Sequence, residues 1–147
     1  MTSKIEWTQS VQTSPLSKLL WLSPLAMAAA TVANLGLYSA ASAIFPQVAA
    51  WPGAGIGQII GANCAYLFMG TLVFALIVRY SAQPARHYWI AATIGLLLSL
   101  GLPIAAGFGY AAPGAPPADV ATVITLSLMH IIAYAISTPL FIRQILH

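Results

Sequence analysis

Charged side chains are so scarce in this sequence that the chain cannot build a surface that faces water on all sides. Its 147 residues include five Lys or Arg and two Asp or Glu, and 60% of them are hydrophobic. A soluble domain carries about 25% charged residues, against 5% here. The sequence therefore predicts an integral membrane protein in contact with the lipid bilayer. Its net charge of +3 is too small to indicate binding to nucleic acid.

Four apolar stretches are long enough to cross a bilayer. A span needs about 20 mainly apolar residues, and such stretches lie at roughly residues 19–45, 56–78, 88–110 and 120–142. Lipid-spanning chains are helices or closed barrels, and the alternating pattern of barrel strands is missing. Short segments rich in Pro and Gly separate the stretches. We expect an all-α fold, with residues 19–145 forming four transmembrane helices packed as an up-and-down bundle.

The positions of the basic residues predict how the spans are oriented. All five lie before the first span, between the second and third, or after the fourth: Lys4, Lys18, Arg79, Arg86 and Arg143. Lys and Arg favour the cytoplasmic side, so we expect both termini there and a cytoplasmic segment at residues 1–18. The first apolar run exceeds the roughly 7–15 residues of a signal peptide core, so we expect this span to be retained.

Each predicted span carries a polar side chain near its middle. Asn34 and His130 lie about 10 or 11 residues from the outer ends of their spans, a depth of about 15–17 Å at 1.5 Å per residue. That depth is near the midplane of a hydrocarbon core about 30 Å thick. Polar groups in lipid should turn inward and hydrogen-bond to one another. The predicted polar layer, which could also bind a ligand, contains His130, Asn34, Ser99, Tyr66, Asn63, Tyr134 and Tyr38.

Besides a purely structural role, three functions are open for this layer. His130 could be one axial ligand of a haem, although His87 and His147 lie near the cytoplasmic surface, too far away to complete the pair. An imidazole titrates near neutral pH and could carry protons, although no span has an acidic or basic partner near its middle. A quinone or another lipid could sit between the helices, with His130 and Tyr134 as hydrogen-bonding groups.

Catalytic and metal-binding patterns are missing from the sequence. Two acidic residues and one cysteine, Cys64, cannot supply paired carboxylates or a recognisable nucleophile with its base. The glycine-rich segment "GAGIGQIIG" has no preceding strand and no following Lys, so it does not predict a phosphate-binding loop. We expect no enzymatic activity, no metal site and no required cofactor, with haem and quinone kept as alternatives.

Small residues recur at four-residue intervals in three spans. Such spacing allows two helix backbones to approach closely in a membrane. Internal helix packing is the expected role, and an interface between chains is the alternative. The positions are Gly57 and Gly61 in the second span, Gly101, Ala105 and Gly109 in the third, and Ala26 and Ala30 in the first.

Four short segments resemble a family of small bacterial four-helix membrane proteins that is known as a domain of unknown function. They are "ATVANLGLY", "RYSAQPARHYW", "LLSLGLP" and "LSLMHIIA", and the resemblance covers roughly residues 18–145. It implies a location in the bacterial inner membrane. It also implies that Asn34, Ser99 and His130 are the polar positions of the family.

From these patterns we expect a non-enzymatic membrane protein that acts as an accessory subunit. Its partner would be another membrane component, either a protein complex or a lipid, or a second copy of this chain, because short loops leave mainly helix faces for contact. The alternative is a bundle that binds a quinone, lipid or haem at His130. A small transporter is the third interpretation.

Overall fold

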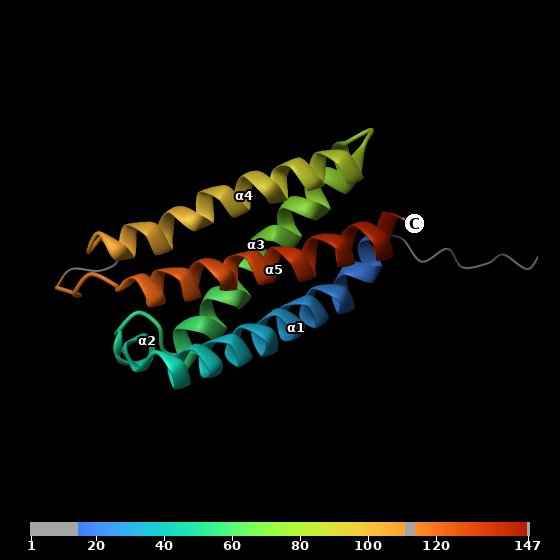
Figure 1. The fold of residues 1–147 in the computed structure, drawn as a ribbon. Coiled ribbons are helices and arrows are strands. Elements are labelled where there is room, and N and C mark those ends of the chain that lie inside the picture. Colours follow the sequence, from blue (N-terminus) through green and yellow to red (C-terminus); the bar gives the residue numbers. More distant parts are fainter. Residues whose placement is uncertain (1–14, 111–113, 147) are drawn as a thin grey trace, which may run out of the picture.

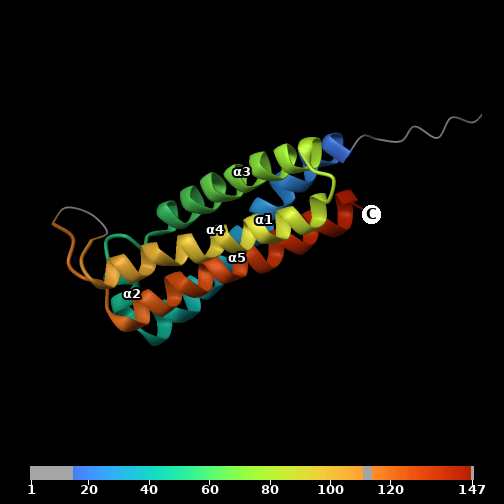
Figure 2. The same ribbon diagram turned by 90° about the horizontal axis from the view of Figure 1, so that it is seen from above.

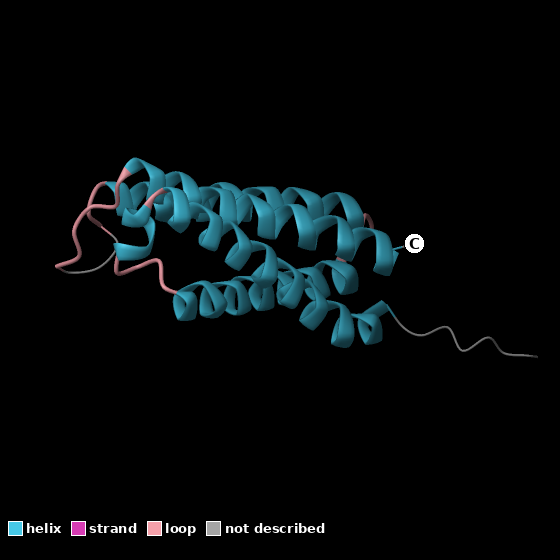
Figure 3. Ribbon diagram, turned by 60° about the horizontal axis from the view of Figure 1, so that its bottom comes forward, coloured by secondary structure: helices cyan, strands magenta, loops and turns pink. Residues whose placement is uncertain are grey.

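The computed structural model describes residues 15–110 and 114–146, and within these ranges the chain is helical, with no strand (Figure 3). The helices are α1 (Pro15–Ile44), α2 (Pro46–Ala50), α3 (Ile56–Tyr80), α4 (Pro84–Gly107) and α5 (Val120–Leu146). All except α2 are long and apolar enough to cross a membrane. The predictions of an all-α fold and a multi-pass membrane protein are confirmed. Lys4, His147 and most of the predicted segment 1–18 lie outside the described residues.

The ends of the long helices follow local sequence signals. Helix α4 begins at Pro84, earlier than the predicted residue 88. Proline suits the first turn of a helix, because N–H groups there have no partner within the helix and proline has no N–H. The helix ends at Gly107 instead of residue 110, because Gly109 adopts a φ of +81°. The N–H groups of residues 108–110 donate to the carbonyls of Ala105 and Ala106 in the last turn. At the start of α5, Asp119 Oδ1 accepts a 2.7 Å hydrogen bond from the Thr122 N–H.

Three of the long helices lie side by side in one layer, and α3 crosses one face of it (Figures 1 and 2). Helix α5 lies between α1 and α4 and contacts both extensively. Helix α3 packs mainly on α1. It contacts α4 less, although only residues 81–83 connect the two helices, and it contacts α5 least. We call the end that holds the start of α1 and the end of α5 the termini end, and the opposite end the α2 end (Figure 1).

An aromatic cluster joins α3, α4 and α5 toward the termini end. Phe74 packs edge-on against Tyr88, with ring centroids 4.5 Å apart, and lies 5.5 Å from the Phe141 ring. Leu19 and Leu22 of α1 complete this buried core. Large rings fill the space between four helices at this level, so α3 is held close to α4 and α5 there.

The glycines predicted to pack helices together occupy other places. Gly57, Gly61 and Gly101 are exposed, and a Cβ added to any of them would meet no atom within 4 Å. Internal packing is therefore wrong for these three. Gly109 lies beyond the end of α4, and half-buried Ala105 lies inside it. In lipid the outer surface is as apolar as the core, so small residues need not face inward.

The stripe of small residues in α1 does lie inside the protein. Ala26 and Ala30 are both 0% exposed, and Asn34 continues the same stripe at 2%. Small side chains here let neighbouring helices approach the α1 backbone closely.

Candidate functional site

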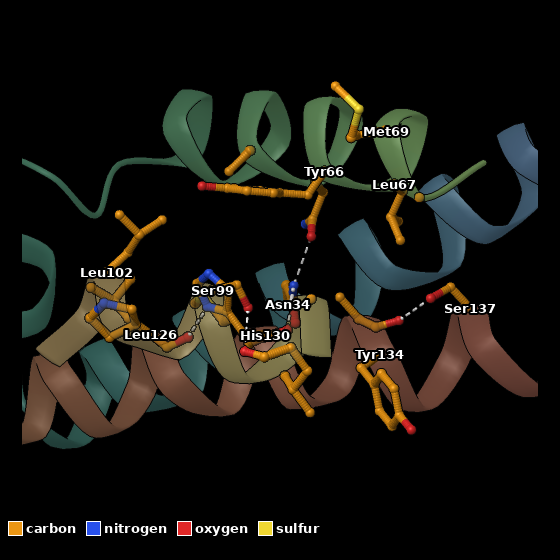
Figure 4. A pocket seen from close by; sticks show the side chains of 18 of the residues that line it. Asn34, Tyr66, Leu67, Met69, Ser99, Leu102, Leu126, His130, Tyr134 and Ser137 are labelled. Carbon is orange, nitrogen blue, oxygen red and sulfur yellow. Dashed lines mark hydrogen bonds between the residues drawn. The ribbon is translucent and has the colours of Figure 1, made fainter. Parts of the chain in front are cut away.

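A cavity of about 510 Å³ lies between α3 and the layer formed by the other helices. It extends from Trp51 and Gln58 near the α2 end to Tyr88 and Phe141 of the aromatic cluster. Its walls come from α1, α3, α4 and α5, and most of them are apolar. Figure 4 shows the Tyr66 ring on the α3 side, facing Ser99 and His130 across the opening. Ligand sites in helical proteins commonly have this size and this mainly apolar lining.

The bridge formed by Asn34 links three helices beside the cavity. Its Nδ2 group donates to Asn63 Oδ1 on α3 at 3.0 Å and to the Met129 carbonyl on α5 at 3.2 Å. The bond to Met129 shows which atom of the Asn34 amide is the nitrogen, because a carbonyl oxygen can only accept. Asn34 and Asn63 are 2% and 7% exposed, so the bridge is shielded from the surroundings.

Each of these two amides keeps a buried atom without a partner. In the described part of the chain, nothing bonds to Asn34 Oδ1 or to Asn63 Nδ2. Both residues line the cavity. Buried polar groups in proteins nearly always have a partner, and leaving one unpaired costs about 1–3 kcal/mol. The cavity wall therefore contains one unmet acceptor and one unmet donor, both on almost fully buried atoms.

His130 presents a further acceptor to the cavity. Its Nδ1 lies 2.8 Å from the Leu126 carbonyl, one turn back on α5. Because a carbonyl cannot donate, Nδ1 carries the proton, and in the neutral ring Nε2 has a free lone pair. No described residue bonds to Nε2. His130 follows Met129 on α5, so its ring lies at the level of the Asn34 bridge.

The ring of Tyr66 lies against His130. The two ring centroids are 6.0 Å apart, with the planes tilted by 60°. Tyr66 is half exposed, and none of the described residues hydrogen-bonds to its hydroxyl. It lies one turn beyond Asn63 on α3, and both residues line the cavity.

Tyr134 and Ser99 also line the cavity, but their hydroxyls are already bonded. Thr93 Oγ1 lies 2.9 Å from the Trp89 carbonyl and must donate to it. The Tyr134 hydroxyl lies 2.9 Å from Thr93 Oγ1. It therefore donates to Thr93, and this bond joins α5 to α4. Ser99 donates to the Leu96 carbonyl of its own helix.

The structure brings six of the seven predicted polar residues to the cavity wall, and Tyr38 is the exception. The expected network, however, divides into separate contacts, because His130 bonds to its own helix and not to an Asn or Tyr. Thr93 was not predicted, although its place one turn after Trp89 in an apolar span marked it as a polar group in need of a partner. Within the described residues, no three His, Cys, Asp or Glu side chains come together.

Comparisons with protein-family models, with curated proteins and with solved structures found no match to this chain. The functional argument therefore rests on the cavity and its polar groups.

Proposed function

We propose that this membrane protein binds a lipophilic small molecule in the cavity between α3 and the α1–α5–α4 layer. One observation carries the proposal: an apolar cavity of about 510 Å³ has unpaired hydrogen-bonding atoms from Asn34, Asn63 and His130 gathered at one level. Apolar walls attract a hydrocarbon chain, and a few polar groups orient its head. The site has no catalytic role in this proposal.

The cavity suits a molecule of modest size. At about 30 Å³ for each group the size of a water molecule, 510 Å³ holds about 17 non-hydrogen atoms. A single acyl or isoprenoid chain with a small head has this volume, whereas a phospholipid with two long chains exceeds it. A quinone head with a short tail also fits. Haem lacks support, because among the described residues His130 is the one histidine that lines the cavity.

The proposal includes a topology in the bacterial inner membrane with both termini in the cytoplasm, as an up-and-down arrangement of four spans. The charges support this orientation. Lys18, Arg79, Arg86 and Arg143 all belong to helix ends at the termini end, whereas Asp119 precedes α5 at the α2 end. Basic residues remain preferentially in the cytoplasm. Cysteine labelling from the two sides of sealed vesicles tests this orientation.

Photolabelling in a reconstituted bilayer tests ligand binding. A diazirine probe on an alkyl chain should label Tyr66 and Leu96 in the cavity, and excess unlabelled probe should suppress that labelling. Leu98, which is 75% exposed, should be labelled in proportion to the probe, without saturation. If cavity residues behave like Leu98, the cavity is not a binding site.

Two glycine substitutions on α4 give a matched pair for this assay. Gly95 lines the cavity, and a Cβ added there meets no atom within 4 Å. Gly95→Leu adds about 120 Å³, four groups of about 30 Å³ each, and so fills roughly a quarter of the cavity. Gly101→Leu is equally free of contacts but lies outside the cavity. Only Gly95→Leu should remove the saturable labelling.

An accessory-subunit role is the second candidate function. The observation that favours it is the open α3 surface at Gly57 and Gly61, where a close helix neighbour would meet no side chain of this protein. Such small-residue surfaces suit helix association in membranes. Gly61→Leu should then release a co-purifying membrane subunit, while leaving the saturable labelling of the cavity intact.

A further inference from the structure

The polar groups of the cavity differ in what they require from a bound molecule. Asn63 Nδ2 is an unpaired donor, so it requires an acceptor. The Nε2 atom of neutral His130 is a free acceptor, because Nδ1–H is bonded to the Leu126 carbonyl, so it requires a donor. A ligand head that satisfies both needs one donor and one acceptor.

We propose that the ligand is an uncharged lipid with a hydroxyl head, an alcohol or a phenol. Its O–H donates to His130 Nε2, and its oxygen accepts from Asn63 Nδ2. This inference rests on the proposed function, since it names the class of molecule that the cavity takes. A hydroxyl is the smallest group that both donates and accepts.

Contacts on two sides of the cavity relate Asn63 to His130. Asn34 Nδ2 bonds both to Asn63 and to the carbonyl of Met129, the residue before His130. On the other side, the Tyr66 ring, one turn from Asn63, lies against the His130 ring at 6.0 Å. Asn63 and His130 are thus held at one level of the cavity by contacts on two sides.

Heads of other chemistry satisfy the cavity less well. The carbonyl of a ketone or ester accepts from Asn63 but brings its own lone pairs toward His130 Nε2. A carboxylate or an amine brings a charge into apolar surroundings, which is strongly unfavourable without a counterion. Among the described residues that line the cavity, none is Lys, Arg, Asp or Glu.

Four probes with the same number of non-hydrogen atoms separate these chemistries: tetradecanol, methyl tridecyl ether, pentadecane and tridecanoic acid. Each is added to the full-length protein in the same non-ionic detergent, and retention is measured by native mass spectrometry. The wild type should retain tetradecanol at least about threefold more strongly than the ether, the factor that corresponds to one membrane hydrogen bond of about 0.6 kcal/mol. Pentadecane and the acid should be retained less than the alcohol.

His130→Phe should reduce the alcohol-to-ether ratio to about one, while His87→Phe, a matched change outside the cavity, leaves it unchanged. Equal retention of alcohol and ether by the wild type, stronger retention of the acid, or a preference that survives in His130→Phe would each overturn the hydroxyl assignment. In those cases lipid binding itself stands. If the wild type retains none of the four probes, the proposed function fails together with the inference. The wild-type comparison holds even if His130→Phe does not fold.

Discussion

The hydrogen bond between Asn34 and Asn63 should be measurable as a coupling free energy. Asn34→Leu removes both bonds made by its Nδ2 group, to Asn63 and to the Met129 carbonyl. A membrane hydrogen bond contributes about 0.6 kcal/mol and at most roughly 1.7, so the expected loss of unfolding free energy is about 1–3 kcal/mol. Asn63→Leu removes one of the two bonds, so its loss should be about 0.6 and at most roughly 1.7 kcal/mol.

The double variant shows whether the two losses share one interaction. Because Asn34→Leu alone already removes the shared bond, the double variant should be about 0.6 kcal/mol more stable than the sum of the single losses implies. Reversible unfolding in mixed micelles measures all four free energies. Ser99→Ala is a suitable control, because the Ser99 hydroxyl bonds within its own helix. Additive losses, or an Asn34→Leu loss no larger than that of the control, would refute the bridge between helices.

Three further substitutions have predicted effects on stability. His130→Leu should change the unfolding free energy by less than about 1 kcal/mol in the same assay, because the side chain bonds only to its own helix. A loss above about 2 kcal/mol would make His130 structural. Phe74→Ala should destabilise by about 3–5 kcal/mol, because Phe74 is 0% exposed. An effect equal to that of Leu98→Ala on the surface would contradict the aromatic core. Asp119→Ala should lower the unfolding free energy by about 1 kcal/mol through the lost helix cap, whereas Asp119→Asn should retain most of it.

The helices and the depth of the polar groups could be predicted from the sequence, because both follow from counting residues along apolar stretches. Four long helices occur where four spans were expected. Asn34 and His130 reach the same cavity because equal distances from the span ends correspond to equal depths.

Which side of each helix faces inward was harder to predict. A soluble helix shows its buried face by a stripe of apolar residues, but in lipid the outer face is equally apolar. The spacing of Gly57 and Gly61 therefore predicts a place in the interior, although both glycines are exposed. The sequence also does not predict the short helix α2, because five residues that begin with Pro46 are typical of a loop.

The cavity could not be predicted, because it depends on how α3 crosses the other helices. Large rings at Phe74, Tyr88 and Phe141 hold α3 close toward the termini end. Beyond them, toward the α2 end, α3 presents Asn63 and Tyr66 to the cavity. The proton on His130 Nδ1 likewise follows from a contact with the carbonyl four residues back, and the sequence alone left the imidazole free to pair elsewhere.

Native mass spectrometry of the protein, gently extracted from its own membrane, tests the central claim most directly. The predicted result is a defined extra mass on the wild type and on Gly101→Leu that is reduced or lost in Gly95→Leu, with a lipid alcohol or phenol recovered from the complex. A bare chain, or an extra mass that Gly95→Leu leaves unchanged, would contradict the account.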